Sequence, residues 1–303
     1  MQINALGIGM SLYKFALAAD KSVQIRRALG AETEAYFAAM EAAEQAFFGS
    51  ITNERNQQKF DWLLLRTHLI SRMSDKEVAA LADYRVDKVQ NIAEHLDGNE
   101  RQISIVTSDT LAAAITDINA QQWIGFDTET AATFEKGRRN SNPVSLIQIA
   151  TASHCYLFRM VGRNVSIFKA ALAEVLSEQS NILKLGIGLR SDVNAMKRDF
   201  NIVLSPMLDL NWLMNQLGAA KQMGTVQIAA SVLSLKLPKS KRVTLSNWAL
   251  PLDMPLSNEQ VLYAATDALV ALDIYHGLFA QLEPYKVLWP NTIKQRFLGE
   301  EKE

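Results

Sequence analysis

The sequence predicts an α/β protein, in which a mixed sheet flanked by helices follows a smaller, all-helical region. Residues 11–97 have helix-forming composition and apolar residues at helical spacing, as in GAETEAYFAAMEAAEQAFF (30–48). After a polar break at Asp97–Glu100, short apolar runs alternate with helical segments, which is typical of strands covered by helices. The expected parts are a helical accessory domain (1–100), a second domain (101–290) and a C-terminal tail (291–303).

The elements of the second part follow from their patterns in chain order. Short apolar, β-branched runs predict strands, and longer stretches of helix-forming residues with helical spacing predict helices. Ser108 is expected to cap the first of these helices. Strands are predicted at ISIV (103–106), QWIGFD (122–127), VSLIQIAT (144–151), HCYLF (154–158) and ILKLGIG (182–188), and helices at 108–118, 168–179, 191–200 and around 210–217, 226–234 and 257–282.

One amino-terminal segment, MSDKEVAALADYRVDKVQNIAEHL (73–96), has the rhythm of a helix-turn-helix motif. Asp83 stands where the turn of that motif often has glycine, and the second helix is hardly basic. DNA would find little electrostatic attraction there. An accessory or oligomerisation role therefore fits these helices better than DNA reading.

The amino-acid composition favours some classes of protein and excludes others. Of the 303 residues 49% are hydrophobic and 21% are charged, which suits an ordinary globular core. No uncharged apolar run is long enough for a membrane span, so we expect no membrane partner. Cys155 is the single cysteine, which excludes an internal disulfide and favours a reducing, cytoplasmic location.

The formal net charge of −1 hides an uneven distribution. Residues 1–120 hold 12 Lys and Arg against 16 Asp and Glu, whereas residues 121–290 hold 16 against 13. The second part is therefore the basic one. A basic surface with a local acidic spot suits a polyanion bound together with a metal ion.

Four carboxylates stand in unusual contexts. Asp127 and Glu129 lie one residue apart in the apolar strand IGFDTET, where side chains at i and i+2 point to the same face. Asp192 opens a helix after the strand ILKLGIG, and Asp267 lies within the apolar helix LYAATDALVALDIY. The last two have a structural alternative, because Asp192 could be a helix N-cap and Asp267 could be satisfied by a backbone or arginine partner.

As a set, these four acids supply hard oxygen ligands with no cysteine and no obvious histidine among them. Such ligands suit Mg²⁺ or Mn²⁺ rather than Zn²⁺. Two divalent ions held close together are the usual device for in-line phosphoryl displacement. Tyr263 lies four residues before Asp267, on the same face of its helix.

The segments FDTET, LGIGLRSD and YAATD resemble, in this order, the three motifs of the DEDDy 3′–5′ exonucleases. The similarity is to ribonuclease D and the Werner-type exonuclease domain, and it includes the flanking VSLIQIATASHCYLF and PLSNEQVLYAATDA. It covers about residues 103–283. One departure is Leu269, where relatives often have an aromatic residue.

The resemblance implies a ribonuclease H-like fold and hydrolysis of the terminal phosphodiester at a 3′ end by two Mg²⁺ or Mn²⁺ ions, releasing nucleoside 5′-monophosphates. Asp127, Glu129 and Asp267 match the positions that hold the metals directly. Asp192 matches the acid that engages the second metal, and Tyr263 matches the tyrosine that orients the attacking water or helps to deprotonate it.

Basic residues near the three motifs are expected to contact nucleic-acid phosphates. Trp248 could stack on a base, but we expect it in the core, and Phe134 is the better candidate for contact with the terminal nucleotide. The residues expected to bind nucleic acid are Thr128, Phe134, Lys136, Arg138, Arg139, Arg190, Lys239, Lys241 and Arg242.

The sequence therefore predicts a metal-dependent 3′–5′ exonuclease that acts on single strands or on duplexes with accessible 3′ ends. The alternative is a regulatory protein that captures 3′ ends with little hydrolysis. The sequence leaves the choice between DNA and RNA open, because the 2′-OH contact depends on local geometry. It also leaves the oligomeric state open.

Overall fold

A computed structural model describes residues 67, 78–79, 81–84, 101–132, 142–219, 222–233, 235–238, 240–283 and 293. Its contacts divide the chain into two compact units. One unit comprises Tyr84–Leu210 and Pro238–Gly277, and the other Met1–Asp83, Asn211–Leu237 and Leu278–Glu303. The domain boundaries expected from the sequence stay a prediction, because most of residues 1–100 and 284–303 lie outside the described ranges.

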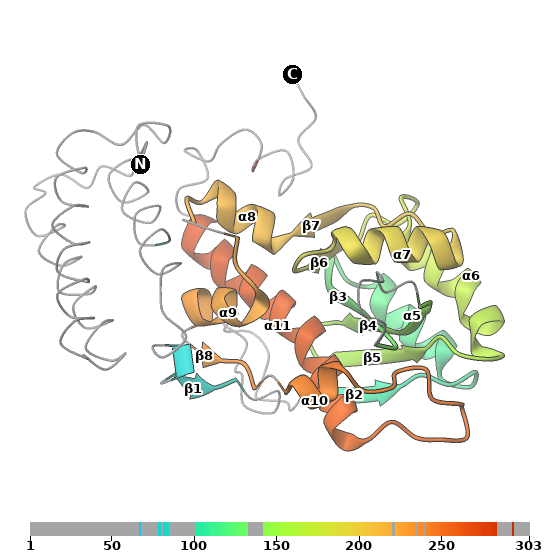
Figure 1. The fold of residues 1–303 in the computed structure, drawn as a ribbon. Helices are drawn as coiled ribbons and strands as arrows, with labels where there is room; N and C mark the ends of the chain where they lie inside the picture. The colour runs from blue at the N-terminus through green and yellow to red at the C-terminus, as the bar shows by residue number, and fades with distance from the viewer. Residues whose placement is uncertain are drawn as a thin grey trace, which may run out of the picture. The chain divides into compact units, whose positions relative to one another are not determined.

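The first unit contains a mixed sheet, as the sequence predicts, and the sheet has six strands (Figure 1). Its order is β2-β5-β4-β3-β6-β7. The β4 strand runs antiparallel to both β3 and β5, whereas the β2–β5, β3–β6 and β6–β7 pairs are parallel. The strands are β2 (Gln102–Ile105), β3 (Trp123–Thr130), β4 (Val144–Ala150), β5 (His154–Arg159), β6 (Leu183–Gly186) and β7 (Met207–Asp209).

Helices lie on both faces of this sheet, because the strands are apolar on both faces. One face packs against helices α5, α6 and α7 through a core that includes Phe126, Ile147 and Phe158. The other face packs against α10 and α11 through Leu146, Leu157 and neighbouring residues. The described helices are α5 (Leu111–Asn119), α6 (Asn164–Leu176), α7 (Arg190–Phe200), α8 (Leu210–Gln216), α9 (Thr225–Leu233), α10 (Lys241–Thr244) and α11 (Asn258–Leu282).

In the second unit, β1 (Ala82–Asp83) pairs in parallel with β8 (Leu235–Lys236). The ammonium of Lys236 lies 3.0 Å from a carboxylate oxygen of Asp83. Asp83 therefore belongs to a short strand and not to the turn of a helix-turn-helix motif. The predicted helices of this motif fall largely outside the described residues.

One further expectation is wrong in detail. The first helix after β2 begins at Leu111, and Ser108 does not cap it but donates a hydrogen bond to Asp109. The short strands β1, β7 and β8 and the helix α10 were not predicted. Among the described helices, none has both the length and the apolar character that a membrane span requires.

A buried ion pair fixes the middle of α11. The guanidinium of Arg101 donates to both carboxylate oxygens of Asp273, at 2.8 and 2.5 Å, and the hydroxyl of Tyr84 donates to the same carboxylate at 2.6 Å. All three side chains are buried. Bidentate geometry and a third donor satisfy the carboxylate in this low-dielectric place.

His276 in α11 introduces a pH dependence. The indole N–H of Trp123 donates to Nε2 of His276 at 3.2 Å, which requires the neutral imidazole. Burial lowers the pKa of His276 below its ordinary value of 6.5; the nearby Asp273 opposes this shift and Arg101 adds to it. The imidazole of His276 therefore takes up a proton at a lower pH in the folded protein than in the unfolded chain.

The free energy of unfolding should consequently fall as the pH drops below about 6.5, until the pKa of the folded state is reached. The contribution of one proton is at most about 1.4 kcal/mol per pH unit. Urea unfolding between pH 7.5 and 5 measures this pH dependence of the free energy of unfolding, for the wild type and for the variant His276→Gln. The variant should lose less stability over this range, and two parallel pH profiles would contradict the assignment.

Candidate metal centre

The β3 strand supplies two acids of the site. Asp127 and Glu129 lie on the face of β3 that carries Gly125, and the apolar Ile124 and Phe126 point to the opposite face and into the core. The apolar residues hold the strand in the sheet, so both carboxylates are presented side by side at its carboxyl end. The pairing with β4 becomes irregular between Glu129 and Thr130, just beyond the second acid.

The α11 helix supplies the third acid, and Gly125 allows the helix to lie close. A Cβ atom added to Gly125 would be 2.0 Å from the carbonyl oxygen of Ala268 and 3.2 Å from the Cβ of Ala150. The backbone of α11 therefore touches the backbone of β3 at this point. Asp267 precedes Ala268 and is brought beside Asp127 by this contact.

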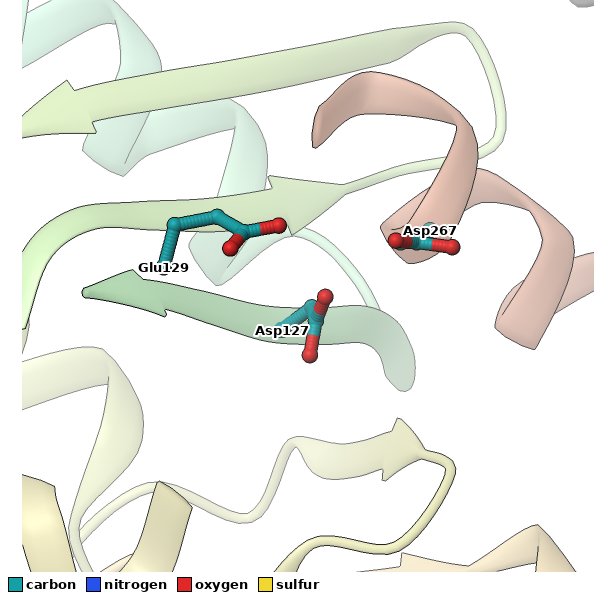
Figure 2. A group of neighbouring side chains, drawn as sticks. All are labelled: Asp127, Glu129 and Asp267. Carbon is teal, nitrogen blue, oxygen red and sulfur yellow. The ribbon is translucent and has the colours of Figure 1, made fainter. Parts of the chain in front are cut away.

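Figure 2 shows Asp127, Glu129 and Asp267 converging from the strand and the helix. One carboxylate oxygen from each lies within 4.8 Å of those of the other two, and all three residues are half-buried. Three carboxylates at this distance repel one another, and a divalent cation would offset that repulsion. The donor set, made only of hard oxygen atoms, fits such a cation.

Asp192 does not lie in this group of three. It is in the first turn of α7, is 8% exposed, and accepts a 2.5 Å hydrogen bond from the hydroxyl of Thr128. Burial raises the pKa of Asp192; the hydrogen bonds from Thr128 and Ser191 oppose the rise, and the charge of Asp209 adds to it. Asp192 is not the N-cap of α7, a position that Leu189 occupies. Its role as a metal ligand stays a prediction.

Asp209, which sequence reasoning missed, holds the turn before α7. Its two carboxylate oxygens accept hydrogen bonds from the backbone N–H groups of Gly188 and Leu189, each at 3.0 Å. A negative charge at a helix N-terminus is favourable. Asp209 thereby fixes the start of the helix that carries Asp192. Its only sequence signal is a carboxylate at the end of an apolar segment.

Tyr263 lies one turn before Asp267 on α11. Its phenol oxygen accepts a 3.1 Å hydrogen bond from the hydroxyl of Thr244, at the end of α10. Its ring is 6.1 Å from the ring of Trp248, which is buried in the core as expected. Thr244 was not predicted, and its contact orients the phenol that the sequence motif singles out.

The structure locates some of the residues expected to bind nucleic acid. Arg190 is exposed at the start of α7, and Lys241 and Arg242 are exposed on α10. Arg242 forms an ion pair with Glu259 of α11. Thr128 contacts Asp192, as described above. Phe134, Lys136, Arg138, Arg139 and Lys239 lie outside the described residues.

Comparison with known proteins decides the family. The family model for the 3′–5′ exonuclease domain matches residues 102–283, which is more than half of the chain. The chain belongs to the 3′–5′ exonuclease family. The matched segment contains Asp127, Glu129, Asp192, Tyr263 and Asp267, so the family resemblance seen in the motifs is confirmed.

Two of the proteins that this chain resembles are named as exonucleases. The chain is 34% identical to the bifunctional 3′-5′ exonuclease/ATP-dependent helicase WRN of Mus musculus over a match that covers 51% of the chain. It is 30% identical to the exonuclease mut-7 homolog of Aedes aegypti over a match that covers 67% of the chain. The matched parts span only 11% and 30% of those two proteins.

Solved structures show the same fold in other family members. The EXO domain of Aedes aegypti Nibbler superposes with a TM-score of 0.53 at 28% identity, covering 63% of this chain and 92% of that domain. Ribonuclease D of Escherichia coli superposes with a TM-score of 0.51 at 21% identity, covering 67% of this chain and 51% of the other. At this lower identity the likeness concerns the fold alone.

Proposed function

We propose that this protein is a metal-dependent 3′–5′ exonuclease that removes nucleoside 5′-monophosphates from the 3′ end of a nucleic acid. The observation that carries the proposal is the convergence of Asp127, Glu129 and Asp267 from β3 and α11. The 3′–5′ exonuclease family to which the chain belongs supports the direction of attack.

In this proposal Asp127, Glu129 and Asp267 would hold divalent cations, Mg²⁺ or Mn²⁺, and Asp192 would contribute to holding a second cation. When bound, such ions supply Lewis-acid stabilisation of the charge that develops on the phosphate. The phenol of Tyr263, held by Thr244, orients the attacking water. Arg190, Lys241 and Arg242 attract the phosphate backbone.

A 5′-labelled oligonucleotide tests the proposal directly. With Mn²⁺ or Mg²⁺ we expect a ladder of products shortened one nucleotide at a time, and EDTA should stop the reaction. Matched single-stranded DNA and RNA, each also offered as a duplex with a free 3′ end, show which sugar and which end the enzyme accepts. Binding without shortening of either polymer would refute the enzyme and favour capture of 3′ ends.

Tyr263→Phe should slow cleavage by about 10²-fold, because general acid–base or water-orienting groups contribute at that order and the metal ligands stay in place. Single-turnover rates at saturating Mn²⁺ measure the effect. Thr244→Val, which removes the hydrogen-bond donor to the phenol, should cause a smaller loss in the same direction. A Tyr263→Phe enzyme as fast as the wild type would remove the tyrosine from the mechanism.

A further inference from the structure

Gln148 lies in the middle of β4 and is fully buried, yet neither end of its side-chain amide has a hydrogen-bond partner among the described residues. Among the described residues, the buried side chains of Arg159 and Trp248 leave a single N–H group each without a hydrogen-bond partner. In Gln148, by contrast, both the amide nitrogen, a donor, and the amide oxygen, an acceptor, lack a hydrogen-bond partner among the described residues. An unpaired buried amide costs about 1–3 kcal/mol for each unsatisfied group, so it requires an explanation.

The register of the sheet places this amide beside the metal centre. Gln148 is directly opposite Asp127 on β3 and directly opposite Leu157 on β5. Residues opposite each other in an antiparallel pair share a face, with Cβ atoms about 4.5–5.5 Å apart. The amide therefore lies on the face that carries the three carboxylates, one strand away from Asp127.

Apolar side chains make up most of the cluster on this face of the sheet. On that face the sheet packs against Ala264, Ala265 and Ala268 of α11, and Leu157 occupies the far side of Gln148. These groups can neither donate nor accept a hydrogen bond through their side chains. The carboxylate of Asp127 is the polar side chain that the cross-strand pairing brings within reach.

From this juxtaposition we infer that Gln148 is a positioning residue for the metal centre. When a divalent cation is bound, its amide N–H donates to the carboxylate of Asp127 and holds that carboxylate in the orientation that the cation requires. The inference rests on the proposed function, because it needs the cation. It explains why an amide, and not an apolar side chain, stands between the core and the acids.

The loss of the hydrogen bond from Gln148 to Asp127 should be measurable as a change in metal affinity. Removing a hydrogen bond to a metal-binding side chain typically weakens metal binding by about 10- to 100-fold. Gln148→Met keeps the length of the side chain and removes the amide. In EDTA this variant should unfold at the same temperature as the wild type or at a higher one, because the amide has no partner to lose there.

Gln260 offers a matched control. It is also a buried glutamine, but its amide donates to the hydroxyl of Ser246 and to the carbonyl of Asn247, and accepts from the N–H of Ser257. Gln260→Met should therefore lower the unfolding temperature in EDTA and leave Mn²⁺ affinity unchanged. The two variants should show opposite patterns.

The experiment is calorimetric titration of the metal-free, full-length protein with Mn²⁺, together with thermal unfolding in EDTA. We expect Gln148→Met to bind Mn²⁺ about tenfold more weakly, and its cleavage rate to recover largely at saturating Mn²⁺. Gln148→Leu repeats the titration with a second apolar side chain, in case the methionine variant does not fold.

Three outcomes would overturn the inference. Mn²⁺ affinity within twofold of the wild type would show that the amide does not serve the centre. A loss of stability in EDTA as large as that of Gln260→Met would show that the amide is already paired without metal. Failure of the wild type to bind Mn²⁺ would remove the proposed function as well, whereas the first two results leave it intact.

Discussion

Asp127→Asn is expected to reduce the rate of 3′-end cleavage by at least about 10³-fold, which is the order that several kcal/mol of lost charge stabilisation produces. The substitution keeps the size of the side chain and removes its negative charge. The site then loses one of the three carboxylates that converge on the centre. The fold should persist, because Asp127 is half-buried and the core of β3 is formed by its apolar neighbours.

Single-turnover cleavage of a 5′-labelled oligonucleotide measures this loss, and filter binding with the same oligonucleotide measures whether the substrate is still held. Asp109→Asn is the matched control, because Asp109 is an exposed carboxylate that contacts Ser108. It should cleave at the wild-type rate. If Asp127→Asn cleaved within tenfold of the wild type, the assignment of the metal centre would be wrong.

Gly125→Ala should impair both stability and cleavage. The new methyl group would overlap the carbonyl of Ala268, a backbone atom that moves only if α11 moves. Overpacking of this kind costs about 1–3 kcal/mol. The displaced helix would carry Asp267 away from Asp127, and a misplacement of about 1 Å can reduce a catalytic rate by about 10²-fold.

Gly224→Ala provides the control for this substitution, because a Cβ atom there meets no atom within 4 Å. Thermal unfolding and single-turnover cleavage should both be near wild type in the control. A Gly125→Ala protein with normal cleavage would show that α11 can shift without disturbing the acids. A further check is Mn²⁺ affinity, which should fall together with the rate.

The main elements of the sheet could be predicted from the sequence because their cores are continuous apolar runs. Apolar composition by itself ends this strand at Asp127, whereas pairing with β4 continues β3 through the polar residues up to Thr130. The short strands β7 and β8 have three and two residues. They are strands because a partner lies beside them, which local composition does not encode.

Some features of the candidate site could likewise be predicted from the sequence, and others could not. The i, i+2 spacing of Asp127 and Glu129 was enough to place both acids on one face. Asp192 and Asp267 stood out by their contexts, and the resemblance to the exonuclease motifs gave each of them an expected role. The hydrogen bond from Thr128 to Asp192 and the contact of Gly125 with Ala268 depend on which face each side chain takes and on how closely a helix approaches. A glycine within a strand was the one available signal for that approach.

Asp267 and Asp273 belong to one helix, six residues and about 9 Å of helix axis apart. The first faces the metal centre, and the second is the buried partner of Arg101 and Tyr84. Separating Asp267 from β3 by movement of α11 would therefore strain an ion pair in the core. The position of Asp267 beside Asp127 and Glu129 is in this way coupled to the stability of the buried core around Asp273.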